Sequence, residues 1–387
     1  MRICLIYDCL FPYTVGGAER WYRNLGERLV AEGHEVTYLT LRQWERGRSA
    51  EVPGVRVVPV GPRMELYSAP GRRRMLPPIV FGLGVFGHLL RVGRRYDVVH
   101  TASFPYFSLL AAAAAHPLGG FRLVVDWHEV WTREYWIEYL GPLGGRVGNA
   151  IQRLCLRVPQ RAFCFSRLHA RRLVAGGLSG SPTVLEGEYA GSLKAREPEP
   201  GGPLVVFAGR HIREKRVSAV VPAIAALRRS AGEVRCVIFG DGPERQHVLK
   251  LVREHGLSDS VSVPGFVDAS EIEATLRRAG CMLLPSSREG YGLVVIEAAA
   301  AGTPSVVVRG DDNAATELVE DGVNGFVAPS AEPADLAAAI SRALAGGMEL
   351  RRTTASWFAD NARRLSLESS LERVSAAYGS SYGCARR

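Results

Sequence analysis

Short apolar runs of five to eight residues alternate along the chain with longer segments in which apolar side chains recur every three or four positions. Most of the short runs are continuously apolar, which is typical of parallel strands covered by helices on both faces. This alternation predicts an α/β protein built from βαβ units in open, doubly wound parallel sheets. The predicted strands are 2–7, 35–41, 55–60, 96–102, 121–127, 162–166 and 181–187, then 203–209, 234–240, 260–266, 281–287 and 303–310.

The strand–helix series is interrupted once, by the segment YAGSLKAREPEPGGP at 189–203. Three Pro, three Gly and mixed charge in this segment indicate a linker. A chain of 387 residues is also too long for one ordinary core. We therefore expect an N-terminal domain (1–188), a C-terminal domain (204–355) and closing helices (356–387) that no strand follows.

Composition places the chain among globular enzymes, since 47% of the residues are hydrophobic and 22% are charged. The seven Cys form no C-x-x-C pair, which argues against a disulfide framework or structural zinc and favours a cytoplasmic protein with buried thiols. The first residues read as a strand and not as a signal peptide. The longest apolar stretch, 75–90, falls short of the roughly 20 residues that span a bilayer, so we do not expect a transmembrane protein.

The formal net charge of +9 belongs to residues 1–188, which carry 24 Arg against 15 Asp and Glu. These Arg residues are spread along helices without aromatic platforms, so nucleic acid is not a predicted partner. Several of them flank 75–90, namely Arg63, Arg72, Arg73, Arg74, Arg91, Arg94 and Arg95. Two interpretations stay open. The basic half serves an anionic acceptor or a peripheral membrane surface, or 75–90 is an internal helix with solvated Arg ends.

The segment REGYGLVVIEAAAAGTP, which starts at position 288, predicts a turn and then a helix from about Leu293 to just before Gly302. Glu297 would lie one turn inside this helix, with its side chain leaning back toward the N-terminus. Glu289 lies on the loop just ahead of the helix. Both carboxylates should therefore converge in front of unpaired backbone N–H groups, a pocket that suits a ligand with phosphates and hydroxyls.

Cations to balance such phosphates follow the strand that opens the second half, in VVFAGRHIREKRV. Arg210 offers a bidentate fork and Lys215 a point charge, and ligands of open α/β sheets bind outside the carboxyl ends of strands. A second anion site is possible at Gly16 and Gly17, which precede the first helix. These glycines do not form a G-x-G-x-x-G fingerprint, so a nicotinamide enzyme is not favoured.

Together these motifs resemble the retaining nucleotide-sugar glycosyltransferases of family 4. The resemblance rests on the two glutamates eight positions apart, Lys215 upstream of them, and four further segments in order. These segments are GGAER (16–20), GDGPER (240–245), VPGFVD (263–268) and ATELVEDGVNGFVAP (315–329). It implies the GT-B arrangement, in which two Rossmann-like domains face each other across a cleft. The donor would lie mainly on the C-terminal domain and the acceptor on the N-terminal one.

The same resemblance implies roles for individual residues. Arg210 and Lys215 would neutralise the diphosphate, Glu289 would hold hydroxyls of the transferred sugar, and Glu297 the ribose. The full set implied for donor binding is Gly16, Gly17, Phe266, Val267, Gly290, Tyr291, Gly292, Leu293, Val294 and Glu297. Two positions depart from the family pattern: Arg216 stands where Gly is frequent, and VLEGEYAG (184–191) replaces a common Pro-Asn-Gly hinge.

The segment VVDWHEVWTREYW, which starts at position 124, is the counterpart in the first half. It contains half of an H-E-x-x-H motif, but Thr132 stands in place of the second His, so a zinc protease site is rejected. The family commonly has a His here near the transferring sugar, which implies His128, with Asp126 and Glu129 as acceptor-side groups. In this family cationic side chains and helix N-termini replace a metal, so we expect neither metal nor cofactor.

The implied chemistry is same-face transfer from a UDP- or GDP-linked sugar to a sugar, a lipid-linked acceptor or a small molecule. Two other classes stay open. A nucleotide-sugar 2-epimerase of similar fold would need no acceptor, and a non-catalytic nucleotide-sugar-binding protein would bind donor without turnover. The sequence leaves the base, the sugar, the acceptor and the oligomeric state open.

Overall fold

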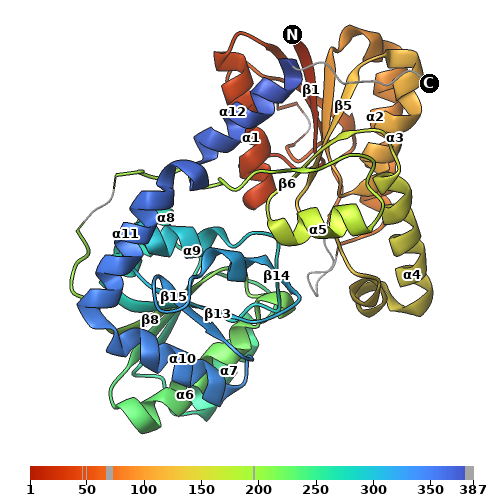
Figure 1. Cartoon of the computed structure of the whole chain (residues 1–387). Helices are drawn as coiled ribbons and strands as arrows, with labels where there is room; N and C mark the ends of the chain where they lie inside the picture. The colour runs from red at the N-terminus through yellow and green to blue at the C-terminus, as the bar shows by residue number, and fades with distance from the viewer. Residues whose placement is uncertain (46, 49, 67–72, 195–196, 380–387) are drawn as a thin grey trace. The chain divides into compact units, whose positions relative to one another are not determined.

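The computed structural model describes residues 1–379 except 46, 49, 67–72 and 195–196 (Figure 1). Within these ranges the chain folds into two compact units. Unit 1 comprises the described residues of 1–185 and of 370–379, and unit 2 those of 186–369. The first boundary falls between Leu185 and Glu186, ahead of the proline-rich segment, and residues 370–379 belong to unit 1.

Unit 1 is built on a seven-stranded sheet whose pairings are all parallel, in the order β3-β2-β1-β4-β5-β6-β7. Its strands are β1 (Arg2–Ile6), β2 (Glu35–Leu41), β3 (Arg56–Gly61), β4 (Val98–Ala102), β5 (Arg122–Trp127), β6 (Arg161–Cys164) and β7 (Thr183–Val184). The strand order reverses between β1 and β4, and ligands of such sheets bind outside the carboxyl ends at this switch point.

The helices of unit 1 are α1 (Gly17–Ala31), α2 (Leu76–Val92), η1 (Gly93–Arg95), α3 (Tyr106–Gly119), α4 (Arg133–Leu156) and α5 (Arg167–Ala175). The end of the chain adds α12 (Leu367–Gly379), which belongs to unit 1 from Ser370. The core beneath α2 and α3 joins fully buried strand residues such as Ile6, Val99 and Val125 to Phe81 and Leu109 of these helices. Continuous burial of the strands explains their unbroken apolar runs.

Residues Leu76–Arg95, which form α2 and η1, are long and apolar enough to cross a membrane by length and composition alone. About 39% of this stretch is buried inside the protein, where Phe81, Val85 and Leu89 pack into the core. A core helix passes the same test, so the observation is weak evidence for a span.

Unit 2 contains a six-stranded sheet with parallel pairings in the order β10-β9-β8-β11-β13-β15, and a short parallel pair, β12-β14. The strands are β8 (Gly202–Ala208), β9 (Arg235–Phe239), β10 (Val261–Gly265), β11 (Ala279–Leu284), β12 (Arg288–Glu289), β13 (Ser305–Val308), β14 (Asp312–Asn313) and β15 (Gly325–Ala328). The strand order reverses between β8 and β11, which is therefore the switch point of this sheet.

Helices cover both faces of the sheet of unit 2, with α6, α7 and α10 on one face and α8, α9 and α11 on the other (Figure 1). They are η2 (Arg213–Lys215), η3 (Val217–Ala219), α6 (Val220–Ala231), α7 (Arg245–Glu254), α8 (Ala269–Arg278), α9 (Leu293–Ala300), η4 (Ala314–Leu318), α10 (Pro333–Ala345) and α11 (Gly347–Leu365).

The predicted fold class is confirmed, since both main sheets are parallel and doubly wound. The predicted strands appear, although 181–187 keeps only the two residues of β7. The strand β15 was missed because its four residues lie between turn-forming glycines and a proline. Six of the seven cysteines are buried free thiols, as expected, and Cys384 lies outside the described residues.

Candidate functional site

The switch point of unit 2 brings together two residues that lie 74 positions apart. Lys215 ends η2 after β8, and Glu289 lies on β12 after β11. The Lys215 Nζ donates to Glu289 Oε1 at 2.5 Å, and the Glu289 side chain is only 8% exposed. A buried carboxylate is stable in its charged form when a cation and hydrogen-bond donors satisfy it. Lys215 and Glu289 each follow the carboxyl end of a strand, so their contact lies at that edge of the sheet.

Residues beyond the sequence motif hold Glu289 in place. The Ser286 hydroxyl donates to Glu289 Oε1 at 2.7 Å, and Glu289 pairs with Asn313 in the short β12-β14 ladder. The buried Asn313 amide in turn donates to the carbonyls of Ser286 (3.2 Å) and Val308 (2.8 Å). These bonds tie the segment that carries Glu289 to β13 and β14.

The helix α9 begins at Leu293 and ends at Ala300, as predicted. Gly292 precedes it with φ 105°, a conformation open mainly to glycine, and a Cβ there would lie 2.6 Å from Ala315 Cβ. Tyr291 is buried, and its hydroxyl donates to the carbonyl of Glu186. Glu297 is half-buried one turn inside the helix. Val294, like Leu293, is half-buried at the N-terminal end, and Gly290 lies just before the turn.

The loop after β8 carries the remaining cations. Arg210 is exposed, and Arg216 has left-handed backbone angles (φ 46°, ψ 38°), the one non-glycine residue of positive φ in the described part of the chain. The backbone of this loop touches the GDG segment closely: a Cβ on Gly240 would lie 1.9 Å from the Gly209 carbonyl oxygen. Only glycine fits this approach, so GDGPER positions the loop that carries the cations.

His211, in the same loop, is fully buried, and its ring packs edge-to-face against Phe207 with a centroid distance of 6.0 Å. Its backbone N–H donates to the Asp241 carbonyl at 2.8 Å, and its carbonyl accepts from the Glu244 N–H at 2.9 Å. Burial lowers the pKa of His211, so its neutral form is favoured. The sequence does not single out His211, because one His next to a strand has no distinctive neighbours.

The edge of β10 exposes one aromatic side chain. Phe266 directly follows this strand and is 74% exposed, while Val267 is half-buried. A large exposed aromatic side chain next to a glycine-rich turn is available to stack on a planar ring. The structure thus places both residues at the sheet edge at which base binding is expected.

In unit 1, His128 follows the carboxyl end of β5. Its ring stacks on Phe165 and packs edge-to-face against Tyr22, with centroid distances of 4.6 and 6.3 Å. Its Nε2 has no hydrogen-bond partner among the described residues. Burial lowers the pKa of His128, and Asp126 and Glu129 offset this only in part. The ring is therefore held neutral by its surroundings, and its Nε2 is buried.

Asp126 lies at the same strand end but is fully buried. Its Oδ2 accepts from Trp21 Nε1 at 2.7 Å, its Oδ1 lies 2.8 Å from His100 Nε2, and His100 Nδ1 lies 2.5 Å from the Tyr378 hydroxyl. Burial alone would raise the pKa of Asp126, but His100, His128 and the Trp21 bond together lower it. This network ties β5 to α1, β4 and α12, a connection that the sequence did not indicate.

The other predicted residues of unit 1, Gly16, Gly17 and Glu129, also follow the carboxyl ends of strands. Gly16 caps α1, and a Cβ there would lie 2.4 Å from a carboxylate oxygen of the buried Glu19, whereas a Cβ on Gly17 would meet nothing within 4 Å. Glu129 accepts from Trp131 Nε1 at 2.7 Å. Within the described ranges, no group of three or more His, Cys, Asp or Glu side chains is placed to hold a metal.

The chain is similar to known glycosyltransferase families and to individual enzymes. A family model for glycosyl transferases group 1 matches residues 192–362, and one for a glycosyl transferase 4-like domain matches residues 16–185. The α-D-kanosaminyltransferase of Streptomyces kanamyceticus is 34% identical over 142 residues, which cover 37% of this chain and 36% of that enzyme. The glycogen synthase of Mycobacterium tuberculosis is 27% identical over 367 residues, 89% of this chain and 86% of that enzyme.

The fold matches solved structures over nearly its whole length. The structure of Anabaena HepE in complex with UDP and glucose has a TM-score of 0.73 and 18% identity, with 98% of this chain and 100% of that chain covered. At this identity the likeness speaks for the fold. The models and relatives are transferases, which does not favour the 2-epimerase alternative.

Proposed function

Because the chain belongs to the group 1 glycosyltransferases of the family-4 type, and so to the transferases of the 2.4 class, we propose that it moves a sugar from a nucleoside-diphosphate sugar to an acceptor hydroxyl with retention of anomeric configuration. The contact between Lys215 and Glu289 at the switch point of unit 2 carries this proposal. It places a cation and a carboxylate, the groups that a phosphorylated sugar needs, side by side.

The diphosphate would take Lys215 away from Glu289. A phosphate oxygen competes with the carboxylate for the ammonium group, Arg210 adds a second cation, and the N-terminus of α9 adds free N–H groups. Released from Lys215, Glu289 would accept hydrogen bonds from hydroxyls of the transferred sugar. Glu297 would accept from the ribose hydroxyls, and Phe266 and Val267 would flank the base.

The transfer step needs no covalent enzyme intermediate. The acceptor oxygen forms a bond to the anomeric carbon on the face from which the diphosphate leaves, the carbon–oxygen bond to the diphosphate breaks, and the acceptor proton passes to a phosphate oxygen. Lys215 and Arg210 would stabilise the negative charge that develops on the leaving diphosphate, which is where catalysis of this kind gains most. The neutral His128 would offer a hydrogen bond to the transferring sugar.

A thermal-shift panel with UDP, GDP, ADP and CMP tests the donor site on the wild-type chain and on Glu297→Ala. A nucleotide at about 100 times its Kd adds roughly 2.7 kcal/mol to the free energy of unfolding. We expect one nucleoside diphosphate to stabilise the wild type and to stabilise the variant less. The HepE complex makes UDP the first candidate. Four nucleotides without effect on the wild type would contradict the proposed site.

The stereochemistry has its own test. NMR of the product formed from an α-linked nucleotide sugar should show the α configuration at the new bond. A β-linked product would contradict retention, and the donor site would stand unaffected.

A further inference from the structure

A cavity of about 480 Å³ lies in unit 1. Its walls come from the segment after β4, from the start of α2 and from α4. Six residues of the lining are aromatic: Phe104, Tyr106, Phe107, Trp131, Trp136 and Tyr139. The volume lies within the range of small-molecule sites.

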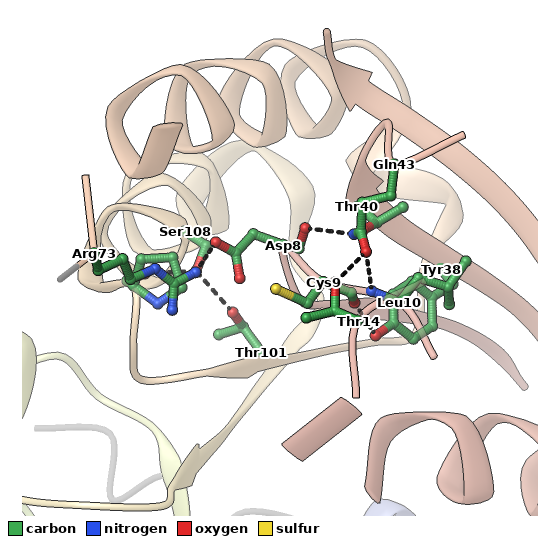
Figure 2. Close-up of polar contacts among 11 residues, drawn as sticks. Asp8, Cys9, Leu10, Thr14, Tyr38, Thr40, Gln43, Arg73, Thr101 and Ser108 are labelled. Atoms are coloured by element: carbon green, nitrogen blue, oxygen red, sulfur yellow. Dashed lines mark hydrogen bonds and ion pairs between the residues drawn. The ribbon is translucent and has the colours of Figure 1, made fainter. Parts of the chain in front are cut away.

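The cavity lies at the switch point of the unit 1 sheet. Phe104 follows the carboxyl end of β4, and Asp8 follows the carboxyl end of β1. Arg73, which lines the cavity, forms an ion pair with the buried Asp8 (Figure 2). Its guanidinium carbon also lies 5.1 Å from the centroid of the Phe104 ring. The cavity thus adjoins the sheet edge that also carries His128, where a ligand of this unit is expected.

The polar tips of the aromatic walls are bound to protein groups. The Tyr106 hydroxyl and Trp136 Nε1 donate to Gln152 Oε1 at 2.8 and 3.2 Å, and Trp131 Nε1 donates to Glu129 at 2.7 Å. Their rings line the cavity while these donors are satisfied elsewhere. Such a cavity suits an apolar ligand group, because a water molecule in it would form few hydrogen bonds.

The arginines beside the cavity are compensated by carboxylates. Arg73 pairs with Asp8, and Arg74 pairs with Glu65 at 2.6 Å. A charged ligand group would have to compete with these carboxylates. These pairs favour a neutral ligand group in the cavity over a charged one.

Apolar side chains continue from the cavity onto the surface. Met75, Leu143 and Val147 line the cavity and are also 55, 76 and 52% exposed, and Leu76 beside them is 60% exposed. Single exposed apolar residues are ordinary, but a group of them around one opening marks a binding surface. A small water-soluble ring compound would not need these exposed apolar residues. A hydrocarbon chain that passes from a membrane into the cavity would remain in contact with them.

We propose that this cavity binds a hydrocarbon chain of the acceptor, so that the acceptor is a lipid and not a free sugar. The acceptor role rests on the proposed transferase function, and chain binding can be measured without it. The chain lies among the aromatic rings, and the hydroxyl-bearing end of the lipid lies at the sheet edge near Asp8 and His128.

Bromoalkane quenching tests the proposal directly, because bromine quenches tryptophan fluorescence on contact and Trp131 and Trp136 line the cavity. The probe is 12-bromododecanol below its aggregation limit, with 1-dodecanol as the unbrominated reference. The variant Val147→Phe narrows the cavity. The matched control is Leu154→Phe on the same helix, since Leu154 is 53% exposed and does not line the cavity.

We expect saturable quenching of the wild type and of Leu154→Phe, with at least tenfold weaker binding to Val147→Phe. Absence of saturable quenching, equal binding to Val147→Phe, or displacement of the probe by 2-naphthol but not by dodecanol would overturn the proposal. The nucleotide panel runs in parallel on the same proteins. A nucleotide shift without chain binding defeats the inference and leaves the transferase proposal, whereas chain binding without any nucleotide shift removes the acceptor role.

Discussion

The contact between Lys215 and Glu289 leads to an unusual prediction for the variant Glu289→Gln. This variant should bind the free nucleoside diphosphate more tightly than the wild type while it loses transferase activity. In the wild type the diphosphate must break the 2.5 Å contact between Lys215 Nζ and Glu289 Oε1. A neutral glutamine keeps the shape and the Ser286 bond but competes far less for the ammonium group.

The magnitude follows from the geometry. Coulomb's law with an effective dielectric constant near 20 gives several kcal/mol at this separation, which is an upper limit. Hydrogen bonds to charged groups contribute about 1.5–3 kcal/mol. Because the Lys215 side chain is 21% exposed, we take the lower end, about 1.5 kcal/mol. Affinity for the diphosphate should therefore rise about tenfold. Loss of the charged acceptor for sugar hydroxyls should lower kcat about 100-fold or more.

Isothermal titration calorimetry with the nucleoside diphosphate identified in the panel measures the affinity, and product formation measures kcat. The matched control is Glu297→Gln, which loses an acceptor for the ribose hydroxyls and should bind the same nucleotide about tenfold more weakly. The two glutamine variants thus change affinity in opposite directions. Weaker nucleotide binding by Glu289→Gln, or unchanged turnover, would refute this reasoning.

Three further predictions concern stability, each measured by urea unfolding of the full chain. Position 216 has left-handed backbone angles, so Arg216→Gly should be about 1 kcal/mol more stable than Arg216→Ala. As a control, Ala219→Gly, at a position with ordinary helical angles, should lower the free energy of unfolding by about 0.5–1 kcal/mol. Equal stability of Arg216→Ala and Arg216→Gly would show that the backbone at position 216 is not strained. Tyr378→Phe removes the buried bond to His100 and should lower the free energy of unfolding by about 1 kcal/mol; an unchanged value would mean that the bond adds nothing. Burial lowers the pKa of His211, so the unfolded chain takes up the proton more readily and stability is lost as pH falls below about 6.5. The loss is at most about 1.4 kcal/mol per pH unit for this group, and His211→Phe should show a shallower slope between pH 7.5 and 5.5; an identical slope would refute the assignment.

Much of the fold and the start of α9 could be predicted from the sequence, because both depend on local pattern. Continuous apolar runs predicted the parallel sheets, and the glycines before Leu293 predicted where α9 begins. The proximity of Lys215 to Glu289 could be expected because both follow strands that meet at a switch point.

The remainder depends on contacts between distant segments. Asn313 supports the Glu289 turn across 24 positions of chain, and nothing around it in the sequence distinguishes it from a loop residue. The pairing of Arg73 with Asp8 could not be read from an Arg-rich stretch in which every cation looks alike. The backbone conformation of Arg216 was equally hidden, since an arginine gives no sign of a positive φ.

The return of α12 to unit 1 has a consequence for protein engineering. The first Rossmann-like unit is not one continuous piece of chain: residues 370–379 complete it, and Tyr378 reaches its buried His100. A chimera that joins residues 1–185 of this protein to the second half of another family member would combine a native sheet with a foreign final helix. Exchanges of specificity between such enzymes should therefore transfer the last helix together with the N-terminal half.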